Sequence, residues 1–221
     1  MLQPFSMHRE TAMAAVVAFV SQKGGPGKST LARALAREGA ASGLKVKLAD
    51  LDLQQGTSLD WSRTRLQFGI EPSISVEAFS TAAKALAVAD QYDLLVIDGP
   101  ARASAGTLEI AKASDLIIQP SGASLDDLRP AVKLFHELVK AGIPLERLAI
   151  ALNHVATDAE EADARAYVGQ AGYAVLAGCL VERPLYRQAQ NGGFAVTEAK
   201  HARLRERADV LIQSIVNRIA A

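Results

Sequence analysis

Short apolar runs alternate with longer segments of helical periodicity along the chain. Several of the apolar runs are continuous, which is typical of strands covered on both faces of a parallel sheet. The runs predict strands at Ala15–Val20, Lys45–Ala49, Ser73–Phe79, Leu94–Ile97, Leu116–Gln119, Leu148–Leu152 and Ala174–Leu180. The periodicity predicts helices at Ser29–Ser42, Leu125–Ala141, Asp158–Gln170 and Ala199–Ala221. Strands that alternate with helices predict an α/β fold, with a three-layer, mostly parallel, doubly wound sheet flanked by helices.

The length of 221 residues suits one domain with a substantial core. We expect residues 1–13 to be a flexible N-terminal leader and residues 14–221 to form a single domain. Lys and Arg number 24, as do Asp and Glu, so no overall basic charge favours nucleic acid and any such binding requires a local patch. The lone Cys179 excludes an internal disulfide and a cysteine-held iron–sulfur cluster. These features, with no long apolar run, predict a cytoplasmic protein.

Ligands of doubly wound folds bind beyond the carboxyl ends of the strands. Three predicted strand ends carry functional groups, at Ser21–Thr30, Asp50–Gln55 and Asp98–Arg102. The first of them reads SQKGGPGKST and ends as a phosphate-binding loop does, although Gln22 stands where the usual motif has its first glycine. Lys28 is expected to reach the β- and γ-phosphates of a nucleotide, and Ser29 to place its hydroxyl on Mg²⁺. Thr30 is expected near the α-phosphate.

The other two strand ends supply carboxylates. A carboxylate facing a phosphate site can hold a metal-bound or attacking water, and Asp52 is the candidate for positioning that water. A turn or helix-capping aspartate is the alternative for Asp50 and Asp52. Asp98 follows an apolar strand and is expected to orient a magnesium-bound water. Asn153 ends a later strand, where its amide either reads adenine or belongs to a turn.

The segment KGGPGKST resembles the deviant phosphate loop of the ParA/MinD family of P-loop ATPases, in particular its short partition ATPases. The segments DLDLQQGTSLDW, VIDGP, ALNHV and VERPLYRQAQNGGFAVTEA are similar to further family motifs, with Leu53 in place of the usual proline. The resemblance implies that Lys23 reaches the nucleotide of a second subunit, so that Lys23, Lys28 and Asp52 form the catalytic set. It implies that ATP is bound by Gly24, Gly25, Pro26, Gly27, Lys28, Ser29, Thr30, Asn153 and Pro184, with Mg²⁺ at Ser29 and, through water, at Asp98.

The resemblance further implies a slow ATPase that dimerises with ATP, binds DNA nonspecifically, associates with the nucleoid and is stimulated by a small ParB-like adaptor. The candidate DNA contacts are Lys200, Arg203, Arg205 and Arg207. The alternative for this segment is a solvated amphipathic helix that only covers the sheet. Positioning of a protein cargo, such as a carboxysome or a chemotaxis cluster, is an alternative function. Membrane cycling of the MinD type is a further alternative, which the few basic residues near the end of the chain disfavour. A metabolic P-loop enzyme is disfavoured by Lys23.

Overall fold

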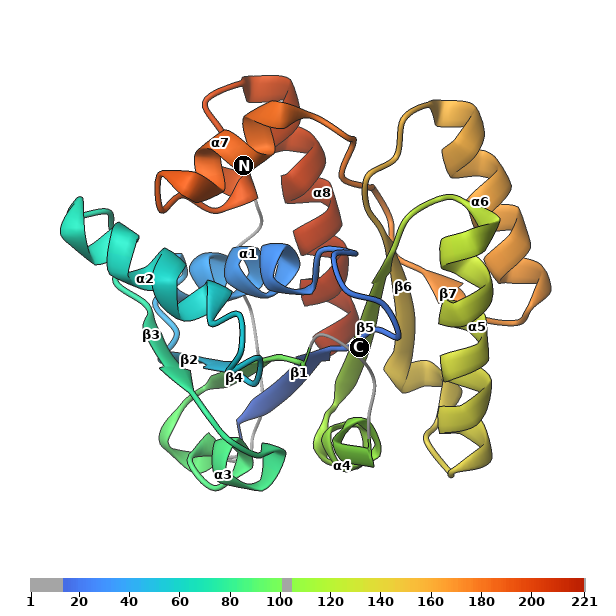
Figure 1. The fold of residues 1–221 in the computed structure, drawn as a ribbon, viewed down its shortest axis with the longest axis horizontal. Coiled ribbons are helices and arrows are strands. Elements are labelled where there is room, and N and C mark those ends of the chain that lie inside the picture. The colour runs from blue at the N-terminus through green and yellow to red at the C-terminus, as the bar shows by residue number, and fades with distance from the viewer. Residues whose placement is uncertain (1–13, 101–104, 221) are drawn as a thin grey trace.

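The computed structural model describes residues 14–100 and 105–220, and the predicted leader at 1–13 lies outside them. A seven-stranded parallel sheet forms the centre of the molecule, with the strand order β3-β2-β4-β1-β5-β6-β7 (Figure 1). The strands are β1 (Ala15–Phe19), β2 (Val46–Asp50), β3 (Ser75–Ala78), β4 (Leu94–Asp98), β5 (Leu116–Ser121), β6 (Leu148–Leu152) and β7 (Ala174–Val175). The predicted parallel sheet is confirmed.

Helices cover both faces of the sheet and complete the three layers (Figure 1). They are α1 (Lys28–Ala41), α2 (Thr57–Gln67), α3 (Ala82–Leu86), α4 (Ala105–Ala113), α5 (Leu125–Lys140), α6 (Asp158–Gln170), α7 (Pro184–Asn191) and α8 (Ala202–Ile219). Short 3-10 turns lie at Ala89–Gln91, Leu145–Arg147 and Val196–Glu198.

Two apolar cores separate the layers, because side chains of successive strand residues point to opposite faces. In β1, Val17 and Phe19 join the core beneath α1, α7 and α8, whereas Val16 and Ala18 join the core beneath α3, α4, α5 and α6. The strand order reverses at β1, which lies between β4 and β5. This is the topological switch point at which ligands of such sheets bind, and the glycine-rich loop follows β1 directly.

The last strand is shorter than the sequence predicts. Strand β7 ends at Val175, although its apolar run continues to Leu180. The rest of the run turns towards α8, where the backbone N–H of Ala177 donates to Ser214 Oγ. Gly178 has a φ of 74° and lies so close to Val210 and Leu211 that a larger side chain would clash with them. The run thus packs against α8 while the N–H groups of Leu176 and Leu180 still donate to carbonyl oxygens of β6.

The final helix also begins later than predicted. A 3-10 turn occupies Val196–Glu198, and α8 starts at Ala202 after an extended Ala199. Lys200 therefore lies before the helix and does not share a helical face with Arg203. Leu204, Leu211 and Ile215 form the buried apolar side of α8, whereas Val210 is 52% exposed.

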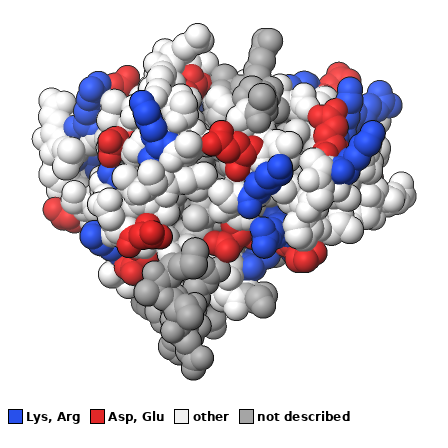
Figure 2. All heavy atoms as spheres, turned by 90° about the horizontal axis from the view of Figure 1, so that it is seen from below, with Lys and Arg blue, Asp and Glu red and all other residues white. Residues whose placement is uncertain are grey.

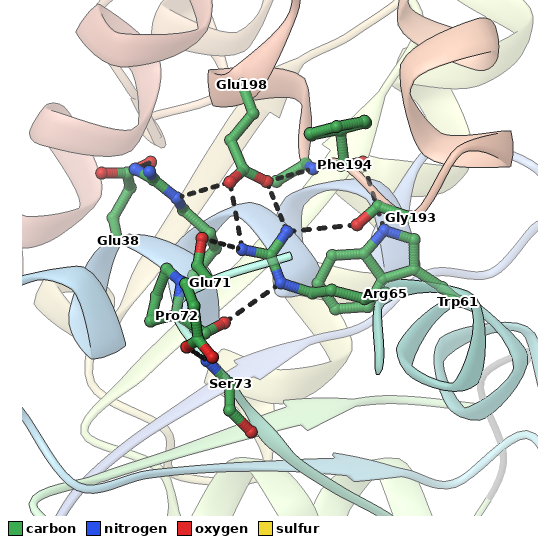
Figure 3. Close-up of polar contacts among 11 residues, drawn as sticks. Glu38, Trp61, Arg65, Glu71, Pro72, Ser73, Gly193, Phe194 and Glu198 are labelled. Carbon is green, nitrogen blue, oxygen red and sulfur yellow. Dashed lines mark hydrogen bonds and ion pairs between the residues drawn. The ribbon is translucent and has the colours of Figure 1, made fainter. Parts of the chain in front are cut away.

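Helices α2, α3, α4 and α7 have no counterpart among the predicted helices. Helix α2 buries three polar side chains, those of Ser58, Ser62 and Arg65, so it has no apolar stripe from which to predict it. Arg65 is 2% exposed and forms an ion pair with Glu198 from the turn before α8 (Figure 3). Its guanidinium also donates to the carbonyl oxygens of Glu71, Pro72 and Gly193. Helix α2 is thereby attached to the C-terminal part of the chain.

The outer surface carries mixed charge on the side seen in Figure 2, where lysine and arginine side chains alternate with acidic ones. This is the side below the sheet in the view of Figure 1. Within residues 14–100 and 105–220, no helix combines the length and apolarity that a membrane span requires.

Candidate nucleotide site

The glycine-rich loop connects β1 to α1 and is shaped for close approach of the backbone. Gly25 and Gly27 have φ angles of 86° and 105°, a region that favours glycine. A side chain at Gly27 would also collide with the amide of Asn153. Gly27 precedes the first residue of α1, so the N–H groups of the loop and of the helix N-terminus lie together, an arrangement that suits a phosphate.

A cavity of about 240 Å³ lies beside this loop and collects most of the predicted phosphate-binding residues. Its walls are formed by Gly24, Gly25, Pro26, Gly27, Lys28, Ser29, Thr30, Arg33, Asp52, Gln55, Thr57 and Gly99. The structure therefore brings the loop, the start of α1 and the carboxylate that follows β2 to one place. Of the third predicted strand end, residues 101 and 102 lie outside the described ranges.

Lys28 is buried and lines this cavity. Burial lowers the pKa of its ammonium group, and the nearby carboxylates of Asp98 and Asp52 oppose that shift. Two carboxylates thus stand close enough to affect its charge. A nucleotide phosphate in the cavity would add further negative charge to this group of residues.

Asp98 is the buried carboxylate at the end of β4, and it is 1% exposed. Burial raises its pKa to about 6, and the neighbouring Asp50 adds to the shift, while the hydroxyls of Ser58 and Ser29 and the charge of Arg33 oppose it. Ser58 Oγ donates to Asp98 Oδ2 over 2.7 Å. Asp98 Oδ1 accepts no hydrogen bond from the described residues. A buried acceptor of this kind suits a Mg²⁺-bound water, so the residues fit the predicted cofactor.

The two aspartates that follow β2 have different surroundings. Asp50 is buried, and its Oδ2 accepts from the backbone N–H groups of Ser58 and Leu59, so it caps the start of α2 from a distance. Asp52 is only partly buried and lines the cavity, and its Oδ1 accepts from the N–H of Gln55. Asp50 is therefore a helix-capping aspartate, which is the alternative given for it above. Asp52 accepts a hydrogen bond within a turn and also lines the cavity.

Lys23 lines a second cavity of about 330 Å³, on the other side of the loop from Lys28. Its Nζ lies 2.9 Å from Asp127 Oδ1 on α5, and both side chains are substantially exposed. Although partial burial opposes the shift, the hydrogen bond from Lys23 contributes to a lowered pKa of Asp127. Lys23 thus pairs with α5 and is not among the residues that line the cavity beside Lys28.

The predicted adenine contacts are less directly placed. Asn153 is buried, its Nδ2 donates to the carbonyl oxygen of Pro26, and its Oδ1 accepts from the N–H of His154. The amide thus supports the glycine-rich loop, and an adenine contact stays a prediction. Pro184 is the exposed first residue of α7 and is not among the residues that form the walls of either cavity.

The candidate DNA-binding residues Lys200, Arg203, Arg205 and Arg207 are all exposed. Arg207 is partly engaged, with its Nη2 3.6 Å from Asp158 Oδ1 and its Nη1 3.8 Å from the sulfur of Cys179. Arg203 and Arg205 lie four and two residues earlier on α8, and a contact of these residues with DNA stays a prediction.

Arg33, Ser58 and Asp127 were not identified from the sequence. Arg33 lies four residues after Ser29, on the same face of α1, and is a charged residue within the otherwise apolar stretch LARALA. That contrast was the available signal. Asp127 is 104 positions from Lys23 along the chain, so nothing local links the two.

Comparisons with known proteins agree with this geometry. Residues 17–193 match the family described as the CobQ/CobB/MinD/ParA nucleotide binding domain. No curated protein matches the sequence.

Several solved structures have the same fold. McdA from Cyanothece in complex with ATP has a TM-score of 0.69 and 17% identity, over 93% of this chain and 97% of that one. MinD from Pyrococcus horikoshii with Mg-ADP has a TM-score of 0.70 and 19% identity, over 92% and 96% of the two chains. A plasmid partition protein from Borrelia burgdorferi bound to AMPPNP has a TM-score of 0.66 and 18% identity, over 91% and 98%.

Proposed function

The chain belongs to the CobQ/CobB/MinD/ParA nucleotide-binding domain family, whose ATPases use ATP with Mg²⁺. On that premise, we propose that it is an ATP-dependent dimerising switch. In this proposal residues 14–221 act as one ATPase domain, which binds DNA nonspecifically and hydrolyses ATP in order to segregate or position plasmid or chromosomal DNA. Hydrolysis is slow until a small ParB-like adaptor stimulates it.

The observation that carries the proposal is the opposite placement of the two loop lysines. Lys28 is buried at the cavity beside the glycine-rich loop, whereas Lys23 is exposed and paired with Asp127 at the neighbouring cavity. A lysine so placed is suited to the phosphates of a second subunit. Because exposed ion pairs contribute at most about 1 kcal/mol, the pair with Asp127 is weak enough to be exchanged for a phosphate contact.

Exposed apolar side chains that are close in sequence to the cavity walls also support a partner. Leu53 follows Asp52 of the first cavity, whereas Leu125 follows Ser124 and Leu185 lies three residues after Glu182, both of the second cavity. These three leucines are 56%, 47% and 43% exposed. A second copy that covered them would remove apolar surface from water, which favours association by about 25 cal/mol per Å².

The roles of the remaining residues follow from their positions. Lys28 neutralises phosphate charge from inside the subunit, and Asp52 positions the attacking water at the cavity rim. Ser29 and, through water, Asp98 hold the Mg²⁺, which supplies Lewis-acid stabilisation of the phosphates. Dimerisation that depends on a lysine reaching the partner's nucleotide makes the assembly sensitive to hydrolysis.

Light scattering of purified protein with ATP, with ADP and without nucleotide tests the dimer. Lys23→Ala should keep ATP binding by the monomer and lose the ATP-dependent dimer. Lys133→Ala, at an exposed lysine on α5, serves as the matched control and should dimerise as the parent does. Normal ATP-dependent dimers of Lys23→Ala would show that the lysine does not act across the interface.

DNA co-sedimentation under the same three nucleotide conditions, beside liposomes, tests the cargo. Reversing the charges of Arg203 and Arg205 should weaken ATP-dependent DNA binding and reduce its salt dependence, because each lost phosphate contact lowers the slope by about 1. Lys84→Glu, at an exposed lysine on α3, is the control on the opposite face of the sheet. Liposome binding without DNA binding would instead indicate a membrane-cycling protein.

A further inference from the structure

Arg33 is a buried cation at the nucleotide cavity that lies outside the glycine-rich loop. It belongs to α1, one turn beyond Ser29, and is 8% exposed. Its side chain lines the cavity together with Lys28 and Thr57. Burial lowers the pKa of its guanidinium, and the carboxylates of Asp98 and Asp50 oppose that shift. Burying a charge costs free energy unless it is compensated, so its contacts indicate its role.

The guanidinium begins a chain of hydrogen bonds that ends on Asp98. Arg33 Nε donates to Ser58 Oγ over 3.1 Å, and the Ser58 hydroxyl then donates to Asp98 Oδ2 over 2.7 Å. Because the hydroxyl accepts from a charged donor, its own O–H is polarised and the second bond is strengthened. Ser58 is fully buried, so water does not compete for these bonds.

Two further contacts brace the guanidinium. Arg33 Nη1 donates to Gln190 Oε1 of α7 over 3.4 Å. The guanidinium carbon lies 5.7 Å from the centre of the Trp61 ring of α2, within the range of a cation–π contact. Contacts from α2 and α7 hold the planar group in one orientation, which a lysine with its single ammonium would not reproduce.

We propose that Arg33 is a positioning residue for the metal site, which acts through Ser58 to fix the Asp98 carboxylate. With Oδ2 held by Ser58, Asp98 Oδ1 is kept as the acceptor for a Mg²⁺-bound water. This role rests on the proposed use of Mg²⁺ and ATP. In this proposal the glycine-rich loop binds the nucleotide, and Arg33 affects the extent to which Mg²⁺ tightens that binding.

The factor by which Mg²⁺ tightens binding of a fluorescent ADP analogue tests the role without requiring hydrolysis. Dissociation constants are measured in EDTA and in Mg²⁺ for the parent, Arg33→Met, Ser58→Ala and the double variant. The Mg²⁺ factor is the ratio of the two dissociation constants of the same variant, so a change in metal-free binding is divided out. Both single variants should lose about threefold to tenfold of this factor, the value of one hydrogen bond. The double variant should lose no more than Ser58→Ala alone, because both act by one route.

Arg37→Met is the matched control, since Arg37 lies one turn further along α1 and contacts Glu38 and Glu198 rather than Ser58. It should keep the Mg²⁺ factor even where it lowers the melting temperature. An unchanged Mg²⁺ factor in either Arg33→Met or Ser58→Ala would overturn the role of Arg33, and Ser58→Ala keeps the proposal falsifiable even if Arg33→Met does not fold. A parent protein that binds no nucleotide would instead refute the proposed function, and this role with it.

Discussion

Replacement of Arg65 by alanine should destabilise the protein more than the loss of any exposed arginine. The five hydrogen bonds of its guanidinium go to Glu71, Pro72, Gly193 and, twice, Glu198 (Figure 3). The variant leaves three carbonyl oxygens without their donor. It also leaves a largely buried Glu198 with Arg37 Nε, 3.1 Å away, as its cationic contact.

Removing one partner of a buried ion pair costs about 3 to 5 kcal/mol, because the remaining charge stays buried. For a chain of this length, 1 kcal/mol shifts the melting temperature by about 2 to 4 °C. The melting temperature of Arg65→Ala should therefore fall by about 6 to 20 °C. Arg65→Met, which keeps most of the side-chain volume, separates the loss of charge from the loss of packing.

Thermal unfolding followed by circular dichroism provides the measurement. Arg63→Ala is the internal control, since Arg63 lies on the same helix but pairs with Asp60 on the exposed surface. That pair should contribute at most about 1 kcal/mol. If Arg65→Ala melts within a degree or two of Arg63→Ala, the buried network does not stabilise the fold and the reasoning is refuted.

Three further predictions concern the nucleotide site. Lys28→Ala should abolish ATP binding in isothermal titration, and retained affinity would place the phosphates elsewhere. Asp52→Ala should accumulate an ATP-bound dimer in light scattering, and unchanged phosphate release would contradict its role in positioning water. In metal-free protein the pKa of Asp98 is about 6 in the folded state and about 4 in the unfolded chain, so between these pH values the folded protein holds an extra proton. The free energy of unfolding should therefore decrease as the pH rises from about 4 to about 6. Urea titrations should show that Asp98→Asn lacks this decrease, and identical pH profiles of the variant and the parent would refute the prediction.

The strands were predictable because the sheet is covered on both sides. A strand such as Leu148–Leu152 is apolar at every position, and the structure places it within the predicted bounds. Helix α2 was not predictable, because its buried face contains Arg65 and Ser58, whose partners come from distant segments. Periodicity records apolar burial, and it does not record polar burial that is compensated across the fold.

The site was predictable to the extent that its chemistry follows the backbone. The loop from Gly24 to Thr30 and the carboxylates of Asp52 and Asp98 lie at adjacent strand ends, which a parallel sheet brings to one edge. The role of Arg33 was not predictable because it depends on the direction of one side chain. The pairing of Lys23 with Asp127 was not predictable because Asp127 belongs to a different strand–helix unit.

The position of Trp61 has a practical consequence for experiments on this protein. It is the single tryptophan of the chain, and its ring has Arg33 5.7 Å and Arg65 5.6 Å from its centre. Its indole N–H donates to the carbonyl oxygen of Phe194 over 3.1 Å. The wild-type protein therefore contains an intrinsic fluorophore between the nucleotide cavity and the segment that leads into α8. Its emission can follow both regions in one cuvette, without a label or a substitution.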